Sequence, residues 1–324
     1  MSSESLKSIL VTGAAGQIGS ELTPKLRERY GRNNVVASDI KKPTEKMLGS
    51  GPFVLLDVTD REGLKGVVEQ YDVDSIFHLA AILSATGEQK PNLAWHVNMD
   101  GLYNVLEVAR KLKGMRVFFP SSIAAFGPET PKKRTPQETV MRPKTIYGIT
   151  KVAGELLCDY YFHRFGLDVR GVRYPGIISS GAPPGGGTTD YAVEMFYAAL
   201  KGDPYVCFVR EETVLPMMYM PDCLKAAIDL MEADLSMLEH HADYNLAGMS
   251  FSAVELASEI QRHIPEFTVK YKPDFRQRIA DSWPNSIDDS AARREWGWKP
   301  SYDLATMTSD MLDKLGRRLK EIEI

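Results

Sequence analysis

A turn spaced by glycines, VTGAAGQIG, follows the first apolar run and constrains the fold more than any other feature of the chain. Gly13 permits a tight turn, Gly16 lets a pyrophosphate approach the backbone, and Gly19 lets the next helix lie close to the strand. Asp39 ends the next predicted strand about 20 residues later, where a carboxylate can accept hydrogen bonds from both hydroxyls of a ribose. The combination predicts a dinucleotide-binding site.

Asp39 also favours NAD over NADP, because a carboxylate repels a 2′-phosphate and the neighbouring Ser38 is not an arginine that binds one. Lys41 and Lys42 follow directly, and we interpret them as part of a solvated loop. We therefore expect NAD as the cofactor.

Asp57 and Val58 end the third predicted strand and are expected to border the adenine. For Asp57 an alternative is equally open, in which the carboxylate caps a helix that begins near Asp60.

The first half of the chain alternates short apolar runs, such as SILV, FVLL and VFF, with amphipathic stretches. This rhythm is typical of βαβ units, and continuous apolar runs are typical of buried parallel strands. We therefore predict an α/β fold, a Rossmann-type doubly wound parallel sheet with a smaller α/β substrate-binding lobe. The NAD-binding domain is expected over residues 1–178 with a return of about 215–247, and the smaller lobe over 179–214 and 248–324. Trp296 and Trp298 are expected to close that lobe.

Composition narrows the class of partner. The 43 acidic and 39 basic residues, net charge −4, are spread along the chain and provide no basic patch for nucleic acid or an anionic membrane. No apolar run approaches the roughly 20 residues that cross a bilayer. Cys158, Cys207 and Cys223 are far apart and suggest neither disulfides nor a metal site. We expect a small-molecule substrate and a soluble intracellular protein, cytoplasmic or, in a eukaryote, in the mitochondrial matrix.

The motif IYGITK places Tyr147 and Lys151 four residues apart, on one face of a helix. An ammonium one turn away stabilises phenolate, and so lowers the pKa of a tyrosine that has to accept an alcohol proton. Ser121 and Ser122 end a buried strand, where ligand-facing residues of an α/β sheet usually lie. A hydroxyl there can donate to the same oxygen.

These motifs occur in the order typical of one family. TGxxGxxG, HLAA, Asn98, SS…FG, YGxTK and RYP together resemble the extended short-chain dehydrogenase/reductase family. The resemblance implies Tyr147 as base, Lys151 as the residue that holds the nicotinamide ribose and tunes Tyr147, and Ser122 as the residue that orients the substrate hydroxyl. The cofactor contacts that it implies are Gly13, Gly16, Gln17, Ile18, Gly19, Asp39, Ile40, Asp57, Val58, Leu79, Ala80, Ala81, Asn98, Tyr147, Lys151, Tyr174, Pro175 and Ile177.

Within that family, AAILSATGE, RYPGIIS, PGGGTTDYAVEMF and ADSWPNSIDDS resemble the NAD-dependent L-threonine 3-dehydrogenases of the nucleotide-sugar epimerase type. This resemblance implies oxidation of the threonine 3-hydroxyl to 2-amino-3-oxobutyrate, and a homodimer formed through helices near residues 102–111 and 152–165. The alternative is a nucleotide-sugar 4-epimerase or dehydratase, whose diphosphate substrate would need Arg210, Arg276 or Arg278. A catalytically idle NAD-binding regulator is disfavoured because all three catalytic residues are present.

The stretch PPGGGTTDYA is predicted to hold the substrate carboxylate, because a glycine run before a helix start presents free N–H groups to an anion. The alternative is a flexible linker before a plain capped helix. Trp283 is balanced between core packing and a wall over the substrate methyl group, and His78 is expected to be a packed strand-end residue. The predicted substrate contacts are Ser84, Ser122, Tyr147, Gly187, Thr188, Thr189 and Trp283.

Overall fold

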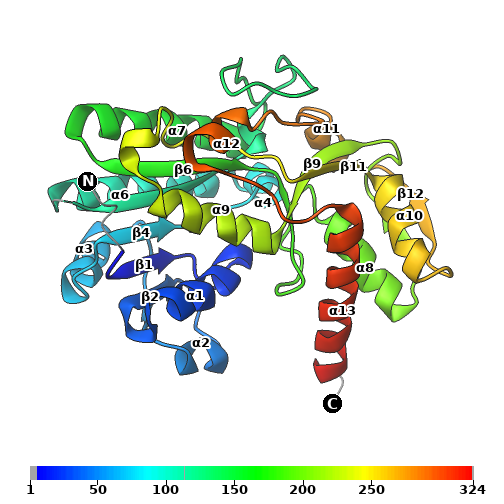
Figure 1. Cartoon of the computed structure of the whole chain (residues 1–324), viewed down its shortest axis with the longest axis horizontal. Helices are drawn as coiled ribbons and strands as arrows, with labels where there is room; N and C mark the ends of the chain where they lie inside the picture. Colours follow the sequence, from blue (N-terminus) through cyan, green and yellow to red (C-terminus); the bar gives the residue numbers. More distant parts are fainter. Residues whose placement is uncertain (1–5, 113, 323–324) are drawn as a thin grey trace.

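A seven-stranded sheet, parallel at every pairing, forms the larger part of the computed structural model, which describes residues 6–112 and 114–322 (Figure 1). Its strands, from one edge to the other, are β10 (Tyr244–Asn245), β6 (Asp168–Tyr174), β5 (Arg116–Ser122), β4 (Ser75–His78), β1 (Ile9–Thr12), β2 (Val35–Asp39) and β3 (Phe53–Leu55). The strand order reverses between β1 and β4, and ligands of such sheets bind outside the carboxyl ends of the strands at this point. The fold class predicted from the sequence is confirmed.

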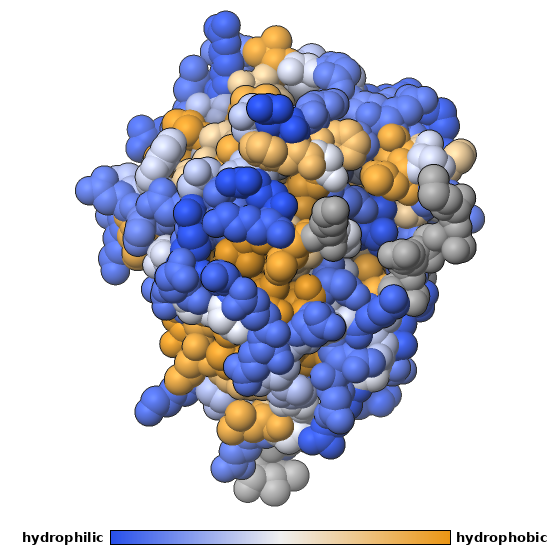
Figure 2. All heavy atoms as spheres, turned by 90° about the vertical axis from the view of Figure 1, so that its left-hand side faces the viewer, coloured by the Kyte–Doolittle hydropathy of each residue, from blue (hydrophilic) through white to orange (hydrophobic). Residues whose placement is uncertain are grey.

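Helices cover both faces of this sheet. One face carries α3 (Arg61–Gln70), α6 (Gly101–Lys111) and α7 (Ile146–Phe165), and the other carries α1 (Gln17–Tyr30), α9 (Met220–Glu232) and α12 (Ser290–Trp296). Shorter elements are α2 (Glu45–Gly49), α4 (Ser84–Gln89), α5 (Pro91–Trp95), a π-helical turn (His96–Asp100) and 3₁₀ turns (Arg32–Asn34, Ile123–Ala125 and Leu235–Met237). Figure 2 views the molecule from the left-hand side of Figure 1 and shows patches of hydrophobic surface between hydrophilic ones.

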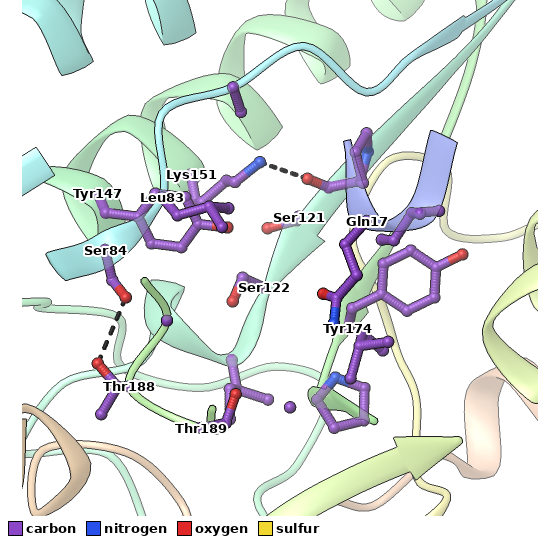
Figure 3. Close-up of a pocket in the computed structure, with 18 of the residues that line it drawn as sticks. Gln17, Leu83, Ser84, Ser121, Ser122, Tyr147, Lys151, Tyr174, Thr188 and Thr189 are labelled. Carbon is purple, nitrogen blue, oxygen red and sulfur yellow. Dashed lines mark hydrogen bonds between the residues drawn. The ribbon is translucent and has the colours of Figure 1, made fainter. Parts of the chain in front are cut away.

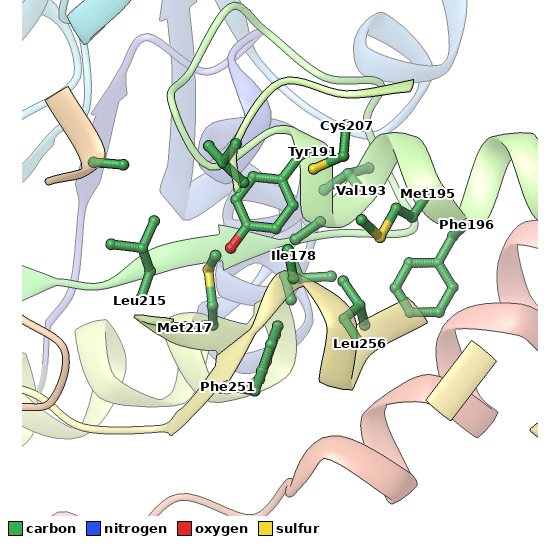
Figure 4. Close-up of a cluster of buried hydrophobic side chains, with 14 of the residues drawn as sticks. Ile178, Tyr191, Val193, Met195, Phe196, Cys207, Leu215, Met217, Phe251 and Leu256 are labelled. Carbon is green, nitrogen blue, oxygen red and sulfur yellow. The ribbon is translucent and has the colours of Figure 1, made fainter. Parts of the chain in front are cut away.

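The side chains packed on the two faces of the large sheet form the first core of the protein. A second core is built around two small sheets. One has the order β11 (Met249–Ser252), β9 (Val214–Tyr219), β7 (Gly176–Ile178), and the other pairs β12 (Val269–Tyr271) with β8 (Tyr205–Cys207). The helices around them are α8 (Tyr191–Lys201), α10 (Ala253–His263), α11 (Arg276–Ala280) and α13 (Leu304–Ile322). Figure 4 shows the buried side chains that join these elements, with Tyr191, Met217 and Phe251 facing one another.

The C-terminal third crosses between the two cores. Helix α12 packs beside β10, and Ala291 and Trp298 are buried in the core that contains α1 and α9. The expectation that Trp296 and Trp298 close the smaller lobe is therefore wrong, since Trp296 stacks edge-on against Tyr244 of the large sheet. Accordingly, we propose that residues 290–298 belong with the NAD-binding domain.

Candidate active site

The glycine turn lies at the switch point of the sheet, as its spacing predicts. Gly13 has a φ of +69°, and a Cβ there would lie 2.6 Å from the Ala80 nitrogen. A Cβ on Gly19 would overlap the carbonyl oxygen of Gly13. Helix α1 begins after Gly16 without a side-chain cap, so N–H groups of its first turn are left for an anion. The cradle that a Cβ would fill, together with this helix start, fits the pyrophosphate of a dinucleotide.

Asp39 lies beside this turn, at the end of β2. One carboxylate oxygen accepts the Ala15 N–H and the other accepts the Lys41 N–H, both at 2.9 Å. Each oxygen keeps a lone pair that can accept a ribose hydroxyl. The next residue, Ile40, is 70% exposed and offers an apolar surface where the adenine is expected.

The structure decides the alternative for Asp57. Asp60 caps α3 by accepting the Gly63 N–H at 3.0 Å, so Asp57 is not the helix cap. Asp57 instead binds the N–H and hydroxyl of Thr59 at 2.9 and 2.7 Å. Val58 is buried and would collide with a Cβ on Gly101.

Asn98 holds the loop that follows β4. Its amide binds the N–H and carbonyl of Ile82 at 2.8 and 3.1 Å and donates to the Thr150 hydroxyl at 3.2 Å. The amide thus ties this loop to α7, and its direct contact with the cofactor stays a prediction.

Helix α7 and strand β5 bring the catalytic candidates together (Figure 3). Thr145 caps the helix by accepting the Gly148 N–H at 3.1 Å, so that Tyr147 lies in the first turn. The Lys151 Nζ lies 5.3 Å from the centroid of the Tyr147 ring and donates to the Pro120 carbonyl at 2.5 Å. The spacing in the sequence thus places both side chains on one wall of the cavity.

The two serines of β5 have different partners. The Ser121 hydroxyl donates to Glu155, and both residues are buried. The Ser122 hydroxyl accepts the Ala124 N–H at 3.2 Å, and Ser122 lines the same cavity as Tyr147. The geometry therefore favours Ser122 as the hydroxyl that acts on the substrate.

Burial dominates the electrostatics of this pair. It raises the pKa of Tyr147 to about 12, and the interaction with Ser122 opposes that shift. It also lowers the pKa of Lys151 to about 8, with Glu155 opposing. In the protein by itself the Lys151 ammonium thus does not produce the lowered tyrosine pKa that the sequence motif suggested, and Tyr147 is a neutral phenol at pH 7.

One cavity of about 210 Å³ connects the glycine turn, the catalytic candidates and the smaller lobe. Ser84 and Thr188, 104 residues apart, meet there with their hydroxyl oxygens 3.3 Å apart (Figure 3). Trp283 is 6% exposed, lines the cavity and also packs in the second core, and its role as a wall over the substrate methyl group stays a prediction.

Most residues predicted for the site line this cavity. They are Gly13, Gly16, Gln17, Ile18, Gly19, Leu79, Ala81, Ser84, Ser122, Tyr147, Lys151, Tyr174, Pro175, Ile177, Gly187, Thr188, Thr189 and Trp283. The predicted residues outside its lining are Asp39, Ile40, Asp57, Val58, Ala80 and Asn98. The lining residues that were not predicted as contacts are Leu83, Pro120, Ser121, Ile123, Gly176 and Asp190. All six lie next to predicted residues or motifs in the sequence, and this proximity is the feature by which the sequence could have indicated them.

The glycine loop differs from its predicted form in one respect. The N–H groups of Gly186 and Gly187 donate to the Asp190 carboxylate at 2.7 and 2.8 Å. They are therefore not free for a substrate carboxylate, contrary to the expectation for this loop. The hydroxyls of Ser84, Thr188 and Thr189 are the neutral donors left at this end of the cavity.

The arginines that a diphosphate substrate would need, Arg210, Arg276 and Arg278, are not among the described residues that line this cavity. Arg210 pairs with Asp281 at 2.6 Å, and Arg276 pairs with Asp274 at 2.7 Å. Among the described residues that line the cavity, the charged side chains are those of Lys151 and Asp190.

His78 is the packed strand-end residue that we expected. It is 3% exposed, and its Nδ1 lies 2.9 Å from the Thr12 hydroxyl. Burial lowers its pKa to about 3, so the ring is neutral over the physiological range.

This fold and site define an NAD-dependent oxidoreductase of the extended short-chain dehydrogenase/reductase class. Residues 9–247 match the model of the NAD dependent epimerase/dehydratase family, and the chain belongs to this family. NAD is the cofactor, as predicted. No helix in the described part of the chain is long and apolar enough to cross a membrane.

Curated relatives include an uncharacterized epimerase/dehydratase of Staphylococcus haemolyticus, 52% identical over 309 residues and covering 95% of this chain and 97% of the relative. Among solved structures, the L-threonine dehydrogenase from Clostridium difficile is 54% identical with a TM-score of 0.94, covering 97% of this chain and 98% of that one. The holo form of the GalE-like L-threonine dehydrogenase from Cupriavidus necator is 54% identical with a TM-score of 0.93, covering 95% and 99%. A UDP-glucose 4-epimerase from Thermotoga maritima is 23% identical with a TM-score of 0.85, covering 96% and 99%, and shares the fold.

Proposed function

We propose that this protein is an L-threonine 3-dehydrogenase, which oxidises the 3-hydroxyl of L-threonine to 2-amino-3-oxobutyrate. The observation that carries the proposal is the Ser84–Thr188 pair, which bounds a cavity of about 210 Å³ next to Tyr147. No arginine stands among the described residues that line this cavity, which favours an amino acid over a nucleotide sugar with its diphosphate. The high identity to solved L-threonine dehydrogenases supports the same substrate.

The roles of the chain's own residues follow from their positions. Bound NAD supplies the acceptor for the hydride that leaves C3. Tyr147 takes the proton of the 3-hydroxyl, and Ser122 donates a hydrogen bond to that oxygen and orients it. Lys151 shifts the equilibrium of Tyr147 towards phenolate when its ammonium is charged. Trp283, which is apolar and nearly buried, excludes water from the side of the substrate methyl group.

NADH formation, followed by absorbance, tests the reaction. L-Threonine should reduce NAD, while UDP-glucose and UDP-galactose should neither reduce NAD nor be interconverted. Tyr147→Phe serves as the control for background reduction. Conversion of the sugars without threonine oxidation would favour the nucleotide-sugar alternative.

We also propose a homodimer formed through α6 and α7. These helices expose Tyr103, Leu156 and Tyr160 to 45%, 61% and 53%, and apolar residues gathered on helix faces are typical of interfaces. Analytical ultracentrifugation should give twice the chain mass, and Leu156→Glu should shift the equilibrium to monomer. A monomeric wild type would contradict this proposal.

A further inference from the structure

Lys132 connects the two sides of the active site. It lies in the loop between β5, which carries Ser122, and α7, which carries Tyr147. Its ammonium donates to the carbonyl oxygens of Asp281 at 2.6 Å and Trp283 at 2.8 Å. Trp283 lines the cavity and packs in the second core, so this contact joins the loop between Ser122 and Tyr147 to the part of the cavity wall that this core provides.

The backbone of the same loop holds the segment that follows Trp283. The Lys132 carbonyl accepts the N–H groups of Asn285 at 2.8 Å and Ser286 at 3.2 Å. Thr135 pairs with Ile287 in a parallel bridge. The two segments are thus bound along several consecutive residues, with the ammonium at the end nearest the cavity.

Local strain supports a fixed geometry for this loop. Arg134 has a φ of +47°, in the left-handed region that residues other than glycine rarely adopt. Its N–H donates to the Ser286 hydroxyl at 2.8 Å. Such a conformation persists only where surrounding contacts fix it, and here those contacts come from the segment that carries Trp283.

The two carbonyls bound by Lys132 lie just beyond the end of α11, where no backbone N–H of the described residues donates to them. Among the described residues, the Lys132 ammonium is the donor to both the Asp281 and the Trp283 carbonyl. Charge-assisted hydrogen bonds are stronger than neutral ones, and losing the donor leaves the carbonyls without a partner. The backbone at Trp283 then loses its side-chain anchor, while the backbone contacts of Asn285 and Ser286 with this loop remain.

We propose that Lys132 is a positioning residue for substrate binding, which holds the Trp283 indole against the cavity by binding the backbone on either side of Ser282. The substrate named in the test rests on the proposed function. Lys132 does not line the cavity and is expected to act only through Trp283.

Lys132→Met keeps most of the stem and removes the donors. It should raise the KM for L-threonine by about fivefold, the scale of one ordinary hydrogen bond, with a smaller change in kcat and an unchanged Kd for NAD. The matched control is Lys133→Met, because Lys133 is exposed and makes no hydrogen bond or ion pair with the described residues. It should behave as wild type, and Lys132→Arg should recover part of the effect.

A double-mutant cycle with Trp283→Phe identifies the route of the effect. If Lys132 acts through the indole, Lys132→Met should raise KM much less in the Trp283→Phe background than in wild type. Full additivity, an unchanged KM or an equal loss of NAD affinity would overturn the proposal.

A spectroscopic test is independent of the substrate. The fluorescence difference between wild type and Trp283→Phe isolates the emission of Trp283, and Lys132→Met should move that emission to longer wavelength as the indole becomes hydrated. An unmoved spectrum overturns the positioning role. Absence of threonine oxidation by the wild type would contradict the proposed function alone, because this spectrum still tests Lys132.

Discussion

Ser121 and Ser122 show how adjacent residues of one type acquire different chemistry. Ser121 donates to the buried Glu155 of α7, while Ser122, at the end of the strand, lines the cavity beside Tyr147 of the same helix. The order of the two residues in the strand therefore assigns one to structure and the other to the reaction.

This difference predicts the effect of removing each hydroxyl. Ser122→Ala should lower kcat on the order of a hundredfold, the usual cost of removing one donor from a reacting oxygen. Ser121→Ala should mainly lower the melting temperature, because Glu155 loses a partner in a buried site. Steady-state kinetics and thermal unfolding measure the two effects. The assignment fails if Ser121→Ala has the larger effect on kcat.

The pKa of Tyr147 predicts a titration that changes with the cofactor. In the protein by itself burial raises this pKa to about 12, so the phenol should stay neutral through pH 10. A base that works near neutral pH needs a lower value, so the rising limb of kcat against pH should lie well below 10. Ultraviolet difference titration against Tyr147→Phe measures the first value and the rate profile measures the second. A phenol that ionises below pH 9 without NAD would contradict the role of burial.

Asp39 predicts the choice of cofactor. Asp39→Ser should narrow the preference for NAD over NADP in kcat/KM, because repulsion of the 2′-phosphate is lost. Steady-state kinetics with NAD and with NADP, for wild type and variant, measure this preference. An unchanged preference in Asp39→Ser would mean that another residue reads the phosphate.

At the scale of elements, the substrate end depends on two segments that meet across the cavity. Helix α4 begins with Ser84, and the glycine loop before α8 carries Thr188. Asp190 folds back onto the amides of that loop, which fixes its shape. The loop is thus held by its own carboxylate, and its threonine side chains are left for the ligand.

Removing either hydroxyl of this pair should weaken substrate binding. Ser84→Ala and Thr188→Val should each raise the KM for L-threonine several-fold, roughly the effect of one hydrogen bond, without changing the Kd for NAD. Because the two hydroxyls are in contact, the double variant should lose less substrate-binding free energy than the two single variants lose together. Wild-type kinetics in both variants would reduce the loop to a linker.

At the scale of the whole molecule, the buried His78 couples folding to pH. Its folded pKa is about 3, against an ordinary value of 6.5, because burial disfavours the charged ring. As pH falls, the unfolded chain therefore takes up a proton on this ring before the folded protein does. The folded protein keeps its full stability above pH 6.5 with respect to this group, and loses stability as pH falls from 6.5 towards 3.

Thermal unfolding of wild type and His78→Asn between pH 7.5 and 5 tests this coupling. As pH falls, the melting temperature of the wild type should decrease more than that of the variant. Asp159, whose pKa burial raises to about 6, acts in the opposite direction but is common to both proteins and cancels in the comparison. A difference that does not vary with pH would contradict the assignment.

The sequence by itself determined the features that depend on local geometry. The spacing of Gly13, Gly16 and Gly19 specifies a turn between strand and helix, and the four-residue interval from Tyr147 to Lys151 specifies one helix face. Helix period, strand alternation and the backbone freedom of glycine operate over a few residues. For that reason the fold class and NAD could be predicted and are confirmed.

Only the tertiary structure decided which distant segments meet. The contact of Ser84 with Thr188, the hold of Lys132 on Trp283 and the packing of Trp298 in the first core join residues far apart in the chain. The hydrogen bonds from the glycine N–H groups to Asp190 are local in sequence. Which of several possible acceptors an N–H group binds is nevertheless decided only when the positions of all of them are known. Packing and hydrogen-bond satisfaction are properties of the assembled molecule, because each contact depends on where every other element lies.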